Sequence, residues 1–326
     1  MGVPAVNTQQ LDCKQGAVRT VRFNVDGNYC MTGGSDRTIK LWNPFRGALL
    51  LQTFLGHGGD VFDVRGSCDN AMLVSAGSDK TVVLWDVSTG RSTRKIRGHV
   101  GSIQTVCFNE DSTVAISGSQ DSTVRAWDLR SRARDPIQVL DQARDAVTSV
   151  CASDHEIVCT SLDGCVRRYD LRQGQLAVDT VGSPVTRALI TRDGLCLLVA
   201  TLGKQACLRL LDKSSGELLQ EFKGYRNEEY YVDCAMSEDD AIVYSGSEDG
   251  SLYCWNLVEG KLLEKLEHPT KGAVHSVSHH PKRSDILTAT GKLVYLWQLK
   301  PPPSETMSVE ELIGPLPQMG DLILDT

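Results

Sequence analysis

SAGSDKTVVLWD, residues 75–86, is the stretch that decides the fold, because close variants of it recur along the chain. The variants are GGSDRTIKLWN at 33–43, SGSQDSTVRAWD at 117–128, TSLDGCVRRYD at 160–170 and SGSEDGSLYCWN at 245–256. Each places a turn rich in Gly, Ser and Asp before a short strand-like run that contains an aromatic residue near its end. Internal repetition is therefore the organising feature of this sequence.

The period of the repeat is set by seven anchor residues. They are Trp42, Trp85, Trp127, Tyr169, Leu211, Trp255 and Trp297, with successive spacings of 43, 42, 42, 42, 44 and 42 residues. Five of the anchors follow an aspartate by six positions, and two follow a Gly-His pair whose histidine stands 28 residues earlier. A repeat of this length with Gly-His and Trp-Asp marks is typical of the WD40 repeat, in which each unit forms one propeller blade.

Each unit also shows the pattern of four short strands separated by turns. In the second unit these strands are expected at 61–64, 71–75, 81–85 and 93–96. Seven such units predict an all-β protein, a seven-bladed β-propeller that forms a single domain over 1–300. The seventh unit ends before three prolines, which cannot donate ladder hydrogen bonds, so its outer strand must come from elsewhere. We expect the N-terminal segment at about 8–13 to complete blade 7.

Composition excludes several functional classes. The 326 residues carry 34 basic and 41 acidic side chains, and the net charge of −7 predicts no strong attraction to nucleic acid or to anionic membranes. No apolar run approaches the roughly 18 residues of a membrane helix, and no secretory signal is visible. The eleven scattered cysteines predict reduced thiols in the cytoplasm or nucleus. The Pro-rich and acidic segment 301–326 is predicted to be a flexible tail.

Two units contain a His-Ser-Asp-Trp set at matching positions. The sets are His57, Ser75, Asp79 and Trp85, and His99, Ser117, Asp121 and Trp127. Their residue types match a hydrolase triad, but catalysis needs an exposed nucleophile, and an active site needs to be built only once. In the WD40 repeat the same residue types form a buried relay that ties the strands of one blade together. We therefore predict a structural relay, no catalytic residue and no enzymatic activity.

The other units depart from this set. Lys14 occupies the expected histidine position of the first unit, Cys159 replaces serine in the fourth, and Gly291 replaces aspartate in the seventh. We expect the fourth, fifth and seventh blades to have incomplete relays, and therefore the weakest protection from hydrogen exchange.

Partner binding is predicted on the narrow face of the propeller, near the channel. The start of each inner strand and the residue before each turn aspartate point to this face, and rigid scaffolds commonly carry recognition residues on such loops. Aromatic residues and arginine are favoured in binding hot spots, and Phe62, Tyr231 and Arg19 are candidates of these types. Alternatively, some of the residues at these positions belong to the ordinary surface of a propeller and bind no partner. The candidates are Arg19, Asp60, Phe62, Gln104, Gln120, Tyr231, Asp233, Glu248 and His275.

Several longer runs resemble one family of WD40 proteins. The runs at 16–47, 163–176 and 208–224 are similar to the mitogen-activated protein kinase organizers, and the resemblance extends over about residues 11–298. It implies a non-enzymatic scaffold that gathers protein components of a kinase cascade, and an association with the spliceosome and pre-mRNA splicing. We expect a monomeric propeller within larger complexes in the cytoplasm and nucleus, with no direct contact to nucleic acid or membrane.

An alternative function is indicated by the opposite face of the propeller. WDLR at 127–130 and YDLR at 169–172 occur in consecutive units. This doubled Asp-x-Arg pattern resembles that of the substrate receptors of cullin-RING ubiquitin ligases, in which Arg130 and Arg172 would pair with acidic groups of an adaptor. The other interpretation is a solvated basic loop.

No cofactor or metal ion is predicted. His275, His279 and His280 are close in sequence, but adjacent strand residues point to opposite faces, so His279 and His280 are poorly placed to chelate together. His279 stands where other units have phenylalanine and is expected at a blade interface. No phosphate-binding loop or metalloprotease motif is present.

Overall fold

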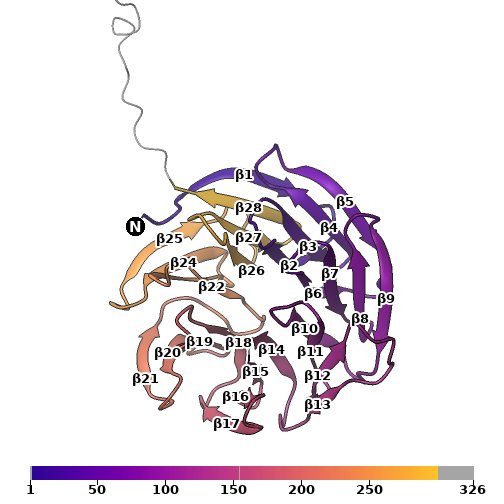
Figure 1. The fold of residues 1–326 in the computed structure, drawn as a ribbon. Coiled ribbons are helices and arrows are strands. Elements are labelled where there is room, and N and C mark those ends of the chain that lie inside the picture. The colour runs from indigo at the N-terminus through magenta and orange to yellow at the C-terminus, as the bar shows by residue number, and fades with distance from the viewer. Residues whose placement is uncertain (1, 154, 300–326) are drawn as a thin grey trace, which may run out of the picture.

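Seven four-stranded antiparallel sheets surround a central channel (Figure 1), and each sheet corresponds to one repeat of the sequence. The computed structural model describes residues 2–153 and 155–299, and within these ranges every regular element is a β-strand. The predicted fold class, an all-β seven-bladed propeller, is confirmed. The predicted tail at 301–326 lies outside the described residues.

In each blade the first strand runs along the channel and the fourth lies outermost. Blade 1 contains β2 (Val18–Phe23), β3 (Cys30–Gly34), β4 (Thr38–Asn43) and β5 (Leu49–Leu55). Blade 2 contains β6 (Val61–Gly66), β7 (Met72–Gly77), β8 (Thr81–Asp86) and β9 (Arg91–Arg97). Blade 3 contains β10 (Ile103–Phe108), β11 (Val114–Ser119), β12 (Val124–Asp128) and β13 (Gln138–Leu140). Blade 4 contains β14 (Val147–Ala152), β15 (Glu156–Ser161), β16 (Cys165–Asp170) and β17 (Gln175–Thr180).

The remaining three blades follow the same order. Blade 5 contains β18 (Val185–Ile190), β19 (Cys196–Thr201), β20 (Leu208–Asp212) and β21 (Leu218–Phe222). Blade 6 contains β22 (Cys234–Met236), β23 (Ile242–Ser245), β24 (Ser251–Asn256) and β25 (Leu262–Glu267). Blade 7 contains β26 (Val274–His279), β27 (Ile286–Thr290), β28 (Leu293–Gln298) and the N-terminal strand β1 (Val6–Asp12).

The apolar core lies between the blades rather than within them. Seven clusters of buried side chains occupy the seven blade interfaces of the described chain. Between blades 2 and 3, for example, Val82 and Ile96 pack with Ile103, Val106 and Trp127. A single blade would leave both faces in water, so its burial depends on its neighbours in the ring.

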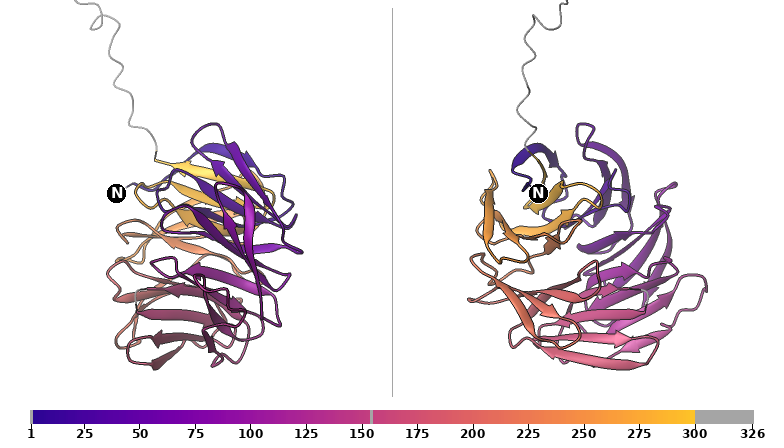
Figure 2. Two further views of the ribbon diagram at one scale, coloured as in Figure 1. Left: turned by 45° about the vertical axis from the view of Figure 1, so that its right-hand side comes forward. Right: turned by 60° about the vertical axis from the view of Figure 1, so that its left-hand side comes forward.

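The ring is closed by pairing of the two ends of the propeller chain. β1 runs antiparallel to β28, from Val6 opposite Gln298 to Asp12 opposite Leu293. Figure 2 shows the indigo N-terminal strand beside the yellow last strand in both views. Leu11 is fully buried at the interface of blades 7 and 1. The N-terminal strand therefore completes blade 7 as predicted, with observed bounds two residues earlier at its start.

Blades 2 and 3 contain the hydrogen-bonded relays. In blade 2 the indole N–H of Trp85 donates to Oγ of Ser75 (2.8 Å), which lies 2.7 Å from Nε2 of His57. His57 Nδ1 lies 2.9 Å from Oδ2 of Asp79. The equivalent three distances in blade 3 are all 2.9 Å. Both serines are fully buried, so the two sets link strands within a blade and present no accessible nucleophile.

Blade 7 contains a third relay, and the expectation that its relay is incomplete is wrong. The indole N–H of Trp297 donates to Oγ1 of Thr288 (2.8 Å), and Nε2 of His268 lies 2.7 Å from the same oxygen. His268 Nδ1 lies 2.9 Å from the carbonyl oxygen of Gly250. A backbone carbonyl therefore accepts the hydrogen bond that an aspartate accepts in blades 2 and 3.

Blade 1 contains a variant of the relay, in which Gln15 rather than Lys14 takes the histidine position. Gln15 is fully buried, and its Oε1 accepts a hydrogen bond of 2.5 Å from the hydroxyl of Thr32. The Thr32 hydroxyl in turn accepts the indole N–H of Trp42 (2.9 Å). Lys14 has a φ of 49° and an exposed side chain. Because the backbone turns left-handed at Lys14, the side chain that is buried beside Thr32 is that of the next residue, Gln15.

Removal of residues 1–14 tests the closure of the ring. The truncation exposes the backbone edge of β28 and removes Leu11 from its interface, so we expect the midpoint of thermal unfolding to fall by at least about 5 °C. Circular dichroism measures this midpoint, and the control is Gln10→Ser, which changes an exposed residue of the same strand. An unchanged midpoint for the truncated protein would contradict the closure.

The relay histidine of blade 7 predicts a pH dependence of stability. Burial lowers the pKa of His268 to about 4, whereas an unfolded histidine binds its proton near pH 6.5. The stability that this neutral imidazole contributes is thus present above about pH 6.5 and lost as the pH falls towards about 4. We expect His268→Gln to reduce the loss of unfolding free energy between about pH 7 and about pH 5 by about 2 kcal/mol, measured by urea unfolding. Equal losses in the two proteins would exclude this role.

Candidate functional site

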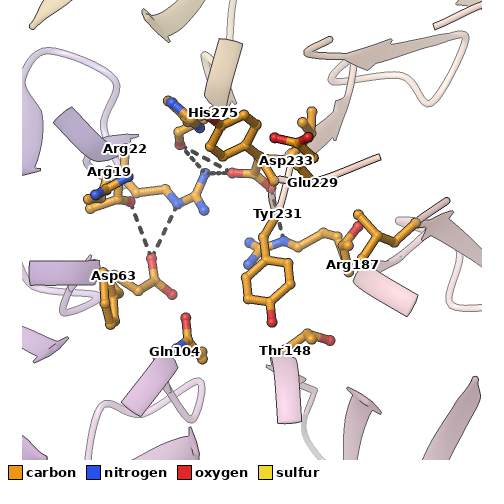
Figure 3. Close-up of a pocket in the computed structure, with 17 residues that line it drawn as sticks. Arg19, Arg22, Asp63, Gln104, Thr148, Arg187, Glu229, Tyr231, Asp233 and His275 are labelled. Atoms are coloured by element: carbon orange, nitrogen blue, oxygen red, sulfur yellow. Dashed lines mark hydrogen bonds and ion pairs between the residues drawn. The ribbon is translucent and has the colours of Figure 1, made fainter. Parts of the chain in front are cut away.

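The starts of the inner strands line a pocket at one mouth of the channel, with a volume of about 430 Å³. We call it the narrow-mouth pocket. Figure 3 shows its lining residues converging from blades around the ring. Six of the nine residues predicted on the narrow face line it: Arg19, Phe62, Gln104, Tyr231, Asp233 and His275. The structure therefore brings together residues that are more than 250 positions apart in sequence.

The rim of the pocket combines aromatic and charged side chains. Tyr231 is 40% exposed, whereas Phe62 and Gln104 are half-buried. Arg19 lies 3.6 Å from Asp60 as an ion pair in which each side chain is about one third exposed. Asp60 is thus a neighbour of the pocket rather than part of its lining. Aromatic residues and arginine at the edge of a hollow are the side chains that protein interfaces favour.

Gln120 and Glu248 lie outside the pocket lining. Gln120 is exposed on the turn before Asp121. The side chain of Glu248 is only 7% exposed, and its Oε1 accepts backbone N–H groups from Glu228, Glu229 and Tyr230 at 2.8, 2.6 and 2.9 Å. This carboxylate therefore helps to hold the loop at 223–233, and the contact of Glu248 with partners stays a prediction.

The loop at 223–233 contributes pocket residues that the repeat pattern does not predict. Glu229 and Tyr230 line the pocket beside Tyr231. The ring of Tyr230 meets the ring of His275 edge-on, with 5.1 Å between their centroids. The spacing of 44 residues between Leu211 and Trp255, the longest in the chain, is the signal that could have indicated this extended loop.

Asp233 lines the pocket, and its contact with partners stays a prediction. The residue is 6% exposed. Its Oδ2 accepts a hydrogen bond from Nη1 of Arg22, and its Oδ1 lies 3.1 Å from Nε of Arg187 (Figure 3). Burial alone would raise the pKa of Asp233, but Arg187 and Arg22 hold it below its usual range. The ionised carboxylate is therefore a fixed part of the channel wall.

The opposite face carries the doubled Asp-x-Arg pattern. Arg130 and Arg172 are exposed and follow β12 and β16 in consecutive blades. Asp128 accepts the backbone N–H of Arg130 (2.9 Å), and Asp170 accepts that of Arg172 (2.8 Å). Aspartates or asparagines at the same point of other blades form the same turn. The aspartates of the pattern thus have a turn-forming role in the fold.

The histidines considered for metal binding take part in separate contacts. His279 stacks on Tyr244 with 5.6 Å between ring centroids, and His280 meets the ring of Phe23 edge-on at 5.1 Å. In the part of the chain that the structure describes, no cluster of three His, Cys, Asp or Glu side chains is arranged to hold a metal ion. Nor do the described residues include a helix that is long and apolar enough to cross a membrane.

Glu248→Ala tests how the pocket loop is held. Loss of the carboxylate leaves three backbone N–H groups without their acceptor, so we expect amide exchange in residues 223–233 to become at least about tenfold faster. Hydrogen–deuterium exchange with mass spectrometry measures this rate. The control is Glu259→Ala, which changes an exposed residue. Unchanged exchange at Glu228, Glu229 and Tyr230 would show that the loop is held by other contacts.

Comparison with known proteins places this architecture in a family. The family model for the WD domain, G-beta repeat, matches residues 6–43, 49–86, 90–128 and 216–256. WD repeat domain-containing protein 83 is 55% identical in Rattus norvegicus and 56% identical in Homo sapiens, over 91% of this chain and 93% of each relative. A homolog of that protein from Dictyostelium discoideum is 33% identical over 86% of this chain and 94% of the relative.

These relatives bear the name WD repeat domain-containing protein 83 rather than that of a kinase organizer, and the names mention no kinase, splicing or ligase function. Identity above 50% over 91% of the chain is sufficient to assign the family. The chain belongs to the WD40-repeat family, within the group of WD repeat domain-containing protein 83.

Proposed function

We propose that this protein is a non-enzymatic scaffold that captures partner proteins at the narrow-mouth pocket. WD40 propellers are typically interaction folds. The observation that carries the proposal is the gathering of Arg19, Phe62 and Tyr231 at one open mouth of a rigid ring. Tyrosine and arginine are enriched among the few residues that dominate binding energy at protein interfaces, and phenylalanine is enriched in interface cores.

The shape of the pocket favours a protein segment as its ligand. The pocket opens to solvent at the channel mouth, and its rim carries Tyr230 and Tyr231, each at least 40% exposed. The floor is formed by the paired charges of Asp233, Arg22 and Arg187. An exposed aromatic rim above a fixed polar floor suits a loop that inserts one or two side chains while its flanks rest on the blades.

Kinase-cascade components are the partners that the resemblance in sequence supports, and splicing factors are a second set. A net charge of −7 disfavours direct contact with RNA, so an association with splicing complexes would be made through proteins. We propose that the protein acts in both cytoplasm and nucleus, as a monomeric propeller within larger assemblies.

Ubiquitin-ligase adaptor binding is the alternative. It would use the opposite face, where Arg130 and Arg172 are exposed in adjacent blades. Because the two surfaces lie at different ends of the channel, variants of one face serve as controls for the other.

Substitution of three rim residues tests the proposed function. We expect the triple variant Arg19→Ala, Phe62→Ala and Tyr231→Ala to recover at least about tenfold less of the kinase-cascade and splicing proteins, because it removes the aromatic and basic anchors. The measurement is quantitative affinity purification from nuclear and cytosolic fractions. The midpoint of thermal unfolding is expected to stay within about 2 °C, since the three side chains are partly exposed.

The matched control is the double variant Arg130→Ala and Arg172→Ala, which should retain these partners. Retention by the triple variant together with loss by the double variant would contradict the proposal. Recovery of a ligase adaptor that is lost only in the double variant would establish the alternative.

A further inference from the structure

The outer strand of blade 4, β17, is more regular than the other outer strands of the described chain. In five blades the outer strand has one extra residue beside the anchor position, which shifts its register against the neighbouring strand. The outer strand of blade 3, β13, has only three residues. In contrast, the six residues of β17 pair without interruption with Cys165–Asp170. Short and irregular edge strands resist the addition of a further strand, whereas a regular edge presents a row of N–H and C=O groups, so β17 is the edge most open to pairing.

The side chains of β17 do little to protect this edge. Five of its six residues are exposed, and the exposed fractions of Leu176 and Val178 are 40% and 48%. The charged residue of the strand, Asp179, accepts a hydrogen bond from Nε of Arg168 (3.0 Å). Proteins usually guard an edge strand with lysine or proline, and the sequence of β17 contains neither. A partner strand can therefore approach β17 without meeting an unpaired charge on it.

A first hollow of about 310 Å³ lies beside β17, on the face of blade 4 that is turned toward blade 3. Leu176 pairs with Tyr169 and shares its face, and Tyr169 packs among buried residues of blade 3. Leu176 and Val178, which alternate along β17, line this first hollow. The rest of its lining is Gln142, Arg144, Asp163, Cys165, Arg167 and Thr180. Because Arg167 and Asp163 already pair with each other (2.6 Å), the hollow suits an uncharged aliphatic side chain.

A second hollow of about 290 Å³ lies on the other face of blade 4, where blade 5 has Leu211 in its anchor position. Three glycines stand 29 residues before the anchors of blades 2, 3 and 5: Gly56, Gly98 and Gly182. A Cβ atom on the first two would lie 3.1 and 2.6 Å from the indole ring of the anchor tryptophan. A Cβ atom on Gly182 would meet no atom of the described chain within 4 Å. The place that an indole ring fills in blades 2 and 3 is therefore open beside blade 5.

The wall of the second hollow suits an aromatic side chain. Arg209 lines it, and its guanidinium group is held by a hydrogen bond to the carbonyl oxygen of Val181 (2.7 Å) and by another to Oε1 of Glu221 (3.2 Å). A guanidinium group that is fixed in this way can bind the face of an aromatic ring through a cation–π contact. Since a cavity of about 150 Å³ admits benzene, the second hollow has room for an indole or phenol ring.

We propose that β17 binds an extended segment of a partner protein, which adds a fifth strand to blade 4. The backbone of the segment pairs with the edge of β17, and the contacts of its side chains give specificity. Adjacent residues of a strand point to opposite faces, so an aliphatic residue enters the first hollow while its aromatic neighbour enters the second. This surface lies on the outside of the ring, apart from the narrow-mouth pocket, so the two sites can be tested separately.

Two other occupants fit this edge less well. A second copy of this chain would bring its own β17, whose side chains on the face of the second hollow are Ala177 and Asp179, one small and the other charged. Residues 300–326 contain no aromatic side chain. The described chain ends at Leu299, which follows β28 across the ring from β17 (Figure 1). A segment of another protein is therefore the occupant that fills both hollows.

A synthetic strand tests this site on the full chain. The probe is a short fluorescein-labelled peptide in which adjacent leucine and tryptophan residues are flanked by threonine and lysine. We expect saturable binding, measured by fluorescence polarization, and amide exchange in residues 175–180 that is at least about fivefold slower when the peptide is bound. The control peptide carries N-methyl groups on its central residues, which keep the side chains but block backbone pairing. It should bind at least about tenfold more weakly.

Leu211→Trp is the decisive variant, because it places in the second hollow the anchor residue that other blades have. We expect its midpoint of thermal unfolding to equal or exceed that of the wild type, and its affinity for the peptide to be at least about tenfold lower. Ala177→Lys puts a charge on the exposed edge and should weaken binding by a similar factor; it replaces the tryptophan variant if that variant does not fold. The matched control is Ser92→Lys on β9, also exposed, which should bind normally.

Equal affinity for the two peptides, wild-type affinity in both Leu211→Trp and Ala177→Lys, or no binding of the peptide at all would overturn the proposal. Slow exchange of the outward amides of β17 in the free protein would show that the edge already pairs within the chain. A dimer in analytical ultracentrifugation that Ala177→Lys abolishes would assign the edge to a second copy. Either of these two results would also overturn the proposal.

Discussion

The pairing of β1 with β28 is the constraint on which the rest of the structure depends. It joins residues 6–12 to residues 293–298 and supplies the outer strand of blade 7. Without it, blade 7 would lack its edge and the interface between blades 7 and 1 would lose Leu11 and Cys13. Because each blade buries its apolar faces only against its neighbours, an open ring would weaken every interface in turn. Closure therefore fixes the channel and both of its mouths.

Closure also aligns a polar network around the channel. The hydroxyls of Thr20 in blade 1 and Thr105 in blade 3 both donate to Asp63 of blade 2, at 3.4 and 3.3 Å. The backbone N–H of Val150 in blade 4 donates to Thr105 (3.3 Å). The blades are thus joined by hydrogen bonds as well as by apolar packing. This network fixes the starts of the inner strands, which carry the narrow-mouth pocket, and the arginines that face the opposite mouth.

The fold was predictable because each repeat is a local pattern whose meaning does not depend on distant residues. The directions of individual side chains and the shapes of the loops could not be predicted from the repeat pattern alone. Asp233 and Glu248 have the expected positions in the repeat, but an arginine from another blade and a loop of unusual length turn them inward. The relay of blade 7 was missed because its acceptor, the carbonyl of Gly250, belongs to the backbone and leaves no residue type to recognise. Tyr230 was missed because its place depends on how the 223–233 loop folds back.

We propose that a rigid closed ring captures proteins at the narrow mouth of its channel. Site-specific photo-crosslinking tests it most directly, with a photo-reactive phenylalanine analogue placed either at Tyr231 or at Leu171, which is 55% exposed on the opposite face. We expect covalent adducts with partner proteins from position 231 and none above background from position 171. Adducts from position 171 with none from position 231 would contradict it.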